Sequence, residues 1–185
     1  MDKENWYVLR TFEDQEYEAA SLVDFAVSKS FYSLCCVPKK LKLFRIGGEL
    51  RLVEDMMFPG YLFVRSSCPK QLCEELRKSR ELPRFLPFGR DEKREEILIP
   101  ISTMDLDFLQ NVCGERLQVP MGITEITLGE NRKILKAQGV LERYVDQIVR
   151  LNLHKRFAVA KIPLFQRSQT VLFGICLEQD QVVVA

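Results

Sequence analysis

Along the first 112 residues, apolar positions switch between the two-residue period of a strand and the longer period of an amphipathic helix. A strand-like run begins at Trp6, and a helical apolar stripe with acidic residues in its first turn follows it. Pro69 suits a first helical position, and Ser102 suits a helix cap. We predict strands at residues 6–11, 31–37, 58–64 and 82–88, a hairpin at 39–53, and helices at 13–28, from Pro69 and from Ser102.

The hairpin is the clearest local signal. Gly47 and Gly48 form a two-residue turn in which both positions tolerate positive φ. With this turn, Ile46 pairs with Glu49, and the pairing continues along both strands. Two interpretations stay open: a solvated edge protected by lysines, or an arm that reaches nucleic-acid phosphates. The pairs and cations that define the hairpin are Phe44 with Arg51, Leu43 with Leu52, and Lys39, Lys40, Lys42, Arg45 and Arg51 against Glu49.

Residues 58–64 form a dense aromatic and aliphatic run that a proline and a glycine interrupt. The proline cannot donate to a ladder, so we place it at the start of the strand. Beyond it, Tyr61 and Phe63 point to one face, whereas Leu62 and Val64 point to the other. The aliphatic pair suits a core. The aromatic row suits either a second packed layer or a surface that another protein covers.

From residue 123 the sequence pattern becomes that of short strands. We predict these strands at residues 123–128, 132–135, 147–153, 157–162 and 170–177. Residues 141–151 also carry helical spacing, and there we predict a loop followed by a strand. The fold class is therefore α+β. We expect a first domain at 1–112 with an antiparallel sheet flanked by helices, a linker at 113–122, and a small β-barrel at 123–185.

Composition describes an ordinary folded protein, with 46% hydrophobic residues, 29% charged residues and a net charge of +1. The charge is uneven: 17 basic and 19 acidic residues in 1–112, against 9 and 6 in 117–185. The second part thus carries a local basic patch. No apolar run is long enough to span a bilayer, and the charged start lacks a signal-peptide pattern, so we expect a cytoplasmic protein with no membrane partner.

The sequence gives little support for a catalytic site or a metal site. The six cysteines form no Cys-x-x-Cys pair, and His154 is the single histidine. There is no glycine-rich phosphate loop and no Ser-His-Asp set. We expect no metal, no cofactor and no enzymatic activity.

The early Trp-Tyr-Val run and the Phe-Pro-Gly-Tyr-Leu-Phe-Val run about fifty residues later resemble the amino-terminal domain of the NusG family of transcription elongation factors. The second part is similar to the KOW domain that follows it, through Thr127-Leu128-Gly129 and residues 153–159. Arg143, Asp146 and Gln166 stand where that domain usually has glycines. These departures make the chain look like a specialised paralogue of the LoaP antiterminator group.

The resemblance implies that an apolar face binds the clamp helices of RNA polymerase and favours its closed, elongating state. The residues implied are Phe58, Tyr61 and Phe63, with Trp6 and Tyr7 as further members. Aromatic anchors of this kind dominate interface energies.

The resemblance also implies that the KOW domain contacts a nascent RNA hairpin and that the hairpin from Lys39 to Arg51 reaches upstream DNA. Basic side chains supply affinity for phosphates. The RNA candidates are Lys155, Arg156, Lys161, Arg167, Arg143 and Arg150. His154 is a neighbour of this group.

The sequence leaves three alternatives open. The basic residues also suit a merely solubilising surface. The chain also fits a general elongation factor whose KOW domain binds a protein partner. A ribosome-associated RNA-binding protein is the third reading, although such proteins are usually far more basic than +1. We expect a bacterial monomer.

Overall fold

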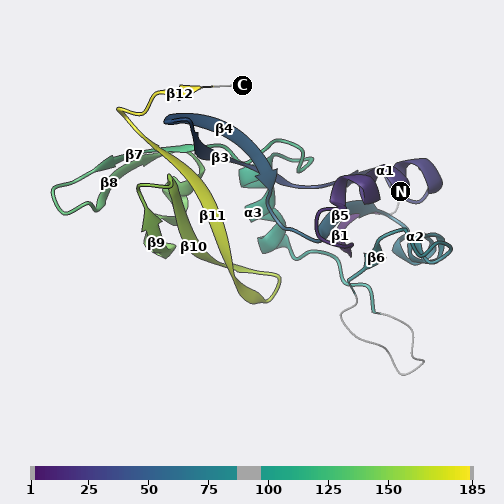
Figure 1. Ribbon diagram of the computed structural model, residues 1–185. Helices are drawn as coiled ribbons and strands as arrows, with labels where there is room; N and C mark the ends of the chain where they lie inside the picture. The colour runs from purple at the N-terminus through teal and green to yellow at the C-terminus, as the bar shows by residue number, and fades with distance from the viewer. Residues whose placement is uncertain (1–2, 87–96, 184–185) are drawn as a thin grey trace.

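The computed structural model describes residues 3–86 and 97–183, and it has the α+β architecture that the sequence predicts. Two helices and a small sheet lie at one end, a five-stranded sheet at the other, and α3 with a long hairpin lies between them (Figure 1). The elements are β1 (Asn5–Arg10), α1 (Glu16–Ala26), β2 (Leu34–Cys36), β3 (Lys39–Ile46), β4 (Glu49–Met56), β5 (Tyr61–Ser66), α2 (Pro69–Leu76), β6 (Arg84–Phe85), α3 (Thr103–Cys113), β7 (Thr124–Leu128), β8 (Ile134–Gln138), η1 (Val140–Gln147), β9 (Ile148–Asn152), β10 (Phe157–Leu164), β11 (Arg167–Leu177) and β12 (Val182–Val183).

The first sheet has the order β2-β5-β1-β6 and is antiparallel throughout. Its register pairs Val8 with Phe63 and Leu9 with Leu62. Directly opposed residues share a face, so the predicted split of the central strand into an aliphatic and an aromatic face is confirmed. The aliphatic face packs in one hydrophobic cluster with residues of α1 and α2, including Val23 and Leu72.

Local signals placed most elements correctly. Pro69 opens α2, and the Ser102 hydroxyl accepts a 3.1 Å hydrogen bond from the Asp105 backbone N–H at the start of α3. Helix α1 begins at Glu16, later than predicted, after Asp14 adopts a left-handed φ of 65°. The strand predicted at 82–88 is confirmed only at Arg84–Phe85, and its last two residues lie outside the described part of the chain.

The turn before β5 is held by a buried carboxylate. Glu16 is fully buried, and its Oε1 accepts a hydrogen bond from the backbone N–H of Gly60, which has φ +83°. On the other side, the Thr11 N–H donates to the Gly60 carbonyl at 2.9 Å. The first turn of α1 and the end of β1 together fix the chain where it enters β5.

The hairpin register is confirmed pair by pair, with Ile46 opposite Glu49, and both turn glycines have positive φ. The hairpin belongs to a separate three-stranded sheet, in which β12 pairs in parallel with β4 (Figure 1). Along the other edge, Leu41 and Met121 are joined by a 2.8 Å backbone hydrogen bond. The base of the hairpin is therefore integrated into the fold, and its tip at residues 44–49 is exposed.

The second half contains the five predicted strands, in the order β8-β7-β11-β10-β9, as a half-barrel consistent with a KOW-type domain. Within residues 141–151, a 3₁₀ helix stands in place of the predicted loop, and the predicted strand follows as β9. Leu141 explains the helical spacing, because it is fully buried against the sheet. Strand β12 was not predicted, since its partner lies about 130 residues away in sequence, at Leu50 and Arg51 opposite Val182 and Val183.

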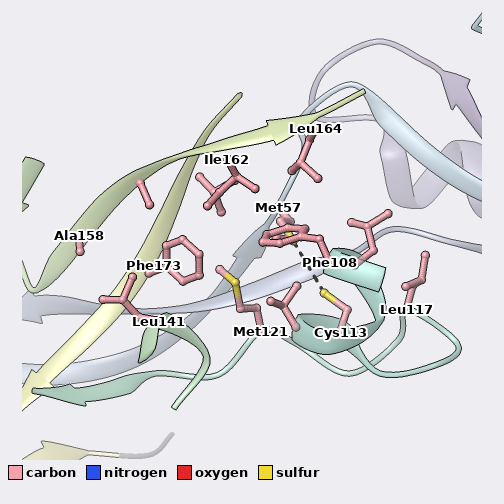
Figure 2. Packing of buried hydrophobic residues seen from close by; sticks show 14 of the residues in the cluster. Met57, Phe108, Cys113, Leu117, Met121, Leu141, Ala158, Ile162, Leu164 and Phe173 are labelled. Carbon is pink, nitrogen blue, oxygen red and sulfur yellow. Dashed lines mark hydrogen bonds between the residues drawn. The ribbon is translucent and has the colours of Figure 1, made fainter. Parts of the chain in front are cut away.

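One hydrophobic cluster runs through both halves. Figure 2 shows Phe108 and Cys113 of α3 gathered with Ile162 and Leu164 of β10 and with Phe173 of β11. The close approach is sharpest at Gly174 of β11, where an added Cβ would lie 2.6 Å from the Leu41 carbonyl oxygen of β3. Because the two halves share this core, the division into domains at 1–112 and 123–185 stays a prediction.

Replacing Glu16 tests the role of the buried carboxylate. In Glu16→Ala the buried N–H of Gly60 loses its acceptor, so we expect the free energy of unfolding to fall by about 1–3 kcal/mol in urea titrations followed by circular dichroism. Glu16→Gln keeps an acceptor oxygen and should lose less. The control Glu18→Ala removes an exposed carboxylate from the same helical turn. Equal stabilities of Glu16→Ala and Glu18→Ala would contradict this role.

Replacing Gly174 tests the close approach of hairpin and half-barrel. Gly174→Ala places a methyl group against backbone, so we expect a loss of about 1–3 kcal/mol in the free energy of unfolding. The matched control is Gly122→Ala, because a Cβ there meets no atom within 4 Å. Thermal unfolding of both variants provides the comparison, and a Gly174→Ala midpoint equal to that of Gly122→Ala would exclude a tight contact.

Candidate functional site

The sequence-predicted polymerase contacts divide between the two faces of the first sheet. Trp6 and Phe63 are buried, 4% and 1% exposed, and belong to the cluster shared by both halves, against which Phe58 and Tyr61 pack half-buried. We call these four residues the aromatic face. The grouping of Tyr7 with them is wrong, because side chains alternate along β1. Tyr7 points to the opposite face and packs edge-on against Phe85, with ring centroids 5.7 Å apart.

The aromatic face is covered by the turn between β10 and β11. The Phe165 ring lies 5.7 Å from the Phe58 ring and 6.2 Å from the Phe63 ring, centroid to centroid. Phe58 and Phe63 are themselves 5.8 Å apart. Such edge-on and tilted geometries are favourable for aromatic pairs. Three rings from the two halves of the chain therefore form one contact.

The turn that presents Phe165 is backbone-strained. Leu164 pairs with Arg167, so Phe165 and Gln166 form a two-residue turn, with φ of 54° and 60°. Two positive φ values are the signature of a hairpin turn that usually holds glycine or asparagine. Gln166 thus adopts a left-handed conformation without being glycine, and side chains in that region cost free energy. The strain is offset by packing, since Leu164 is buried and Phe165 half-buried.

A second aromatic bridge joins α3 to the half-barrel. The Phe108 ring of α3 lies 5.3 Å from the Tyr144 ring of η1, and Tyr144 stacks 5.7 Å from Phe173 of β11. Burial raises the pKa of Tyr144 above its usual value.

Most of the sequence-predicted RNA contacts are exposed but spread over the half-barrel. Arg143 lies on η1, Lys161 on β10 and Arg167 at the start of β11. The Arg150 guanidinium lies 5.6 Å from the centre of the Phe157 ring. Lys155 lies in the turn between β9 and β10. These five cations thus come from five different segments of the half-barrel.

Arg156 has a different environment from its neighbours. Its Nε and Nη2 donate to the two carboxylate oxygens of Asp180 at 2.6 Å, and its Nη1 donates to the Leu153 carbonyl. The side chains are only 13% and 5% exposed. Burial alone would raise the pKa of Asp180, but hydrogen bonds from Arg156 and from the Leu177 N–H hold it below its usual value. The Arg156 guanidinium is thus engaged within the protein, which disfavours it as a phosphate contact.

One feature could not be found from sequence: a cleft of about 420 Å³ between the hairpin and the β9–β10 turn. Lys42, Phe44 and Arg45 line one wall, and His154 and Lys155 line the other. These segments are more than 100 residues apart, so no local pattern joins them. In the part of the chain that the structure describes, no group of three or more His, Cys, Asp or Glu side chains is placed to hold a metal. Within the same residues, no helix is long and apolar enough to cross a membrane.

Comparison with known proteins agrees with this architecture. The family model described as transcription termination factor NusG matches residues 4–109, more than half of the 185 residues. A solved structure from Thermotoga maritima, titled "Domain interaction in Thermotoga maritima NusG", is similar over 93% of this chain and 94% of that one, at 15% identity and a TM-score of 0.51. No curated protein sequence matches significantly. From the family match over the sheet that carries the aromatic face, we conclude that this chain belongs to the NusG family.

Proposed function

We propose that this chain is a transcription elongation and antitermination factor that binds the clamp helices of RNA polymerase through its aromatic face. NusG-family proteins are non-enzymatic transcription factors that bind RNA polymerase. The observation that carries the proposal is the way in which the face is covered. Two of its rings, Phe58 and Phe63, contact Phe165 from a turn of the other half.

A contact of this kind is exchangeable. Each aromatic pair contributes about 0.5–1.5 kcal/mol of stabilisation beyond that of the apolar area it buries. A partner helix that places its own apolar side chains on the face provides stabilisation of similar size. The polymerase-binding form is then one in which Phe165 has left the aromatic face. A ligand shifts such an equilibrium only by its differential affinity for the two forms. Polymerase would therefore stabilise the undocked form.

On the polymerase, the chain would act by linkage. A factor that binds the closed, elongating clamp more tightly than the paused clamp shifts the enzyme toward elongation. This lowers pausing and termination without any chemical step by the factor. The exposed cations of the half-barrel, Lys155, Lys161, Arg167, Arg143 and Arg150, would supply contact with leader RNA. Action on particular operons, as in the LoaP group, follows from that contact.

A second candidate is a general elongation factor whose half-barrel binds a protein. The origin of the cations from five different segments favours it, because a shape-specific RNA site gathers its phosphate contacts. Transcription in vitro separates the two. Increased readthrough of a terminator that depends on a leader sequence supports the antiterminator, whereas readthrough on every template supports the general factor. The hairpin tip is a further candidate for contact with upstream DNA.

Polymerase binding is tested with Phe58→Ala/Tyr61→Ala. We expect core RNA polymerase to bind this variant at least about tenfold more weakly than the wild type, a difference of about 1.4 kcal/mol, because anchors are lost from the interface. Biolayer interferometry measures the affinity. Phe25→Ala is the control, since Phe25 is 91% exposed on α1 and lies outside both core clusters. A wild type that does not bind polymerase would refute the proposal.

The covering contact is tested with Phe165→Ala. Removing this ring weakens docking but removes nothing from the aromatic face, so we expect polymerase to bind about three- to tenfold more tightly, as for a ligand whose binding-competent form becomes more populated. The two substitutions therefore act in opposite directions. Weaker polymerase binding by Phe165→Ala would instead place Phe165 in the polymerase contact itself.

A further inference from the structure

The cleft between the hairpin and the β9–β10 turn has the size of a small-ligand site. Its volume of about 420 Å³ lies within the usual range of about 300–1,000 Å³ for such pockets. Residues of β3 form one wall, and the turn that carries His154 and Lys155 forms the other. The Phe157 ring contributes apolar surface on the same side as the turn.

When the cations that pair with carboxylates are left out, the cleft still has an excess of positive charge. Lys42 pairs with Asp55 at 2.7 Å, and Arg156 pairs with Asp180. Arg45 donates from Nη1 to the Gly48 carbonyl at 2.8 Å, and its charge helps to lower the pKa of Asp180. Among the described residues, neither Arg45 nor Lys155 has a carboxylate within salt-bridge distance. Both cations are exposed, and they stand on opposite walls.

An exposed aromatic residue of β3 also lines the cleft. Phe44 is 57% exposed on β3, opposite Arg51 in the hairpin register. A phenylalanine in that position gains little from folding, because most of its surface stays in water. Aromatic rings next to cations form the usual platform for single-stranded nucleic acid, with a base on the ring and phosphates on the cations.

We propose that this cleft binds an unpaired nucleotide of a single-stranded nucleic acid, with its base stacked on Phe44 and its phosphates on Arg45 and Lys155. This site rests on the RNA contact of the proposed function and describes that contact in the free, docked chain, before polymerase displaces the cover from the aromatic face. The ligand chemistry, a free base face beside a phosphate, is common to RNA and DNA. A paired base in a duplex is excluded, because its faces are already stacked on neighbouring bases.

Because the two walls come from opposite halves of the chain, the cleft is complete only when the halves are docked. A nucleotide bound there stabilises the docked form, in which Phe165 covers the aromatic face. By linkage, nucleic acid in the cleft and polymerase on the aromatic face each weaken the binding of the other. The same substitution at position 165 should thus affect the two ligands in opposite directions.

The experiment measures fluorescence anisotropy of labelled eight-nucleotide oligo(U), oligo(dT) and a blunt RNA duplex with the full-length protein. We expect Phe44→Ala and the double variant Arg45→Ala/Lys155→Ala each to weaken oligonucleotide binding about tenfold, in line with the stacking energy of a base on an aromatic ring. The double variant should also lower the slope of log affinity against log salt by about 1.4, for two single-strand phosphate contacts. All three residues are exposed, so folding should be retained.

The controls match the variants in exposure and charge. Lys136→Ala removes an exposed cation from β8, and Phe25→Ala removes an exposed aromatic side chain from α1. Both should change affinity less than twofold. Phe165→Ala should weaken oligonucleotide binding two- to threefold while leaving every residue of the cleft intact. Equal affinity for oligo(U) and oligo(dT) would assign the site to the shared chemistry, and a preference for oligo(U) would assign it to RNA.

Three outcomes would overturn the site. The first is binding of the duplex as tight as that of the single strands. The second is a loss of binding in Lys161→Ala/Arg167→Ala but not in the cleft variants, which would leave the proposed RNA contact on the outer surface of the half-barrel. The third is no oligonucleotide binding by the wild type. Polymerase affinity is measured separately, so a wild type that binds oligonucleotides through the cleft but not polymerase would refute the proposed function and keep the cleft.

Discussion

The structure depends on the alternation of side chains along β1 and β5, which gives one small sheet two apolar faces. Leu9, Leu62 and Val64 point to the face that helices α1 and α2 cover. Trp6 and Phe63 point to the other, and most of their surface must also be removed from water. Helix α3 covers only part of this second face. The remainder is covered by the half-barrel, so the packing of the two halves follows from the composition of a single strand pair.

The cover has a strained part and a close-packed part. Phe165 reaches the aromatic face from a turn in which two residues other than glycine hold left-handed backbone angles. Gly174 permits the β11 backbone to approach the hairpin at a distance that any side chain would prevent. Strain at the turn lowers the net free energy of docking. In the function proposed above, a partner of similar apolar character displaces this cover.

Signals within about fifteen residues predicted much of the fold. The hairpin register followed from Gly47 and Gly48, and the start of α3 followed from Ser102, because turn and cap chemistry act locally. The site was predicted less completely. Tyr7 was grouped with the wrong face although alternation alone would have separated it. The roles of Phe165 and Arg156 depend on contacts with Phe58 and Asp180, and no pattern in one sequence places such distant residues together.

Charge counts illustrate the same limit in energetic terms. Sequence assigns equal weight to Lys155 and Arg156, which are adjacent cations in one turn. In the structure, Arg156 makes a bidentate pair with a buried carboxylate, and removing either partner would leave the other charge desolvated. Lys155 projects into solvent beside a cleft whose other wall belongs to the hairpin. The structural cation fixes the turn on which the free cation stands. If the cleft binds phosphate as proposed, its affinity depends on how firmly the two halves are docked as much as on the number of basic residues.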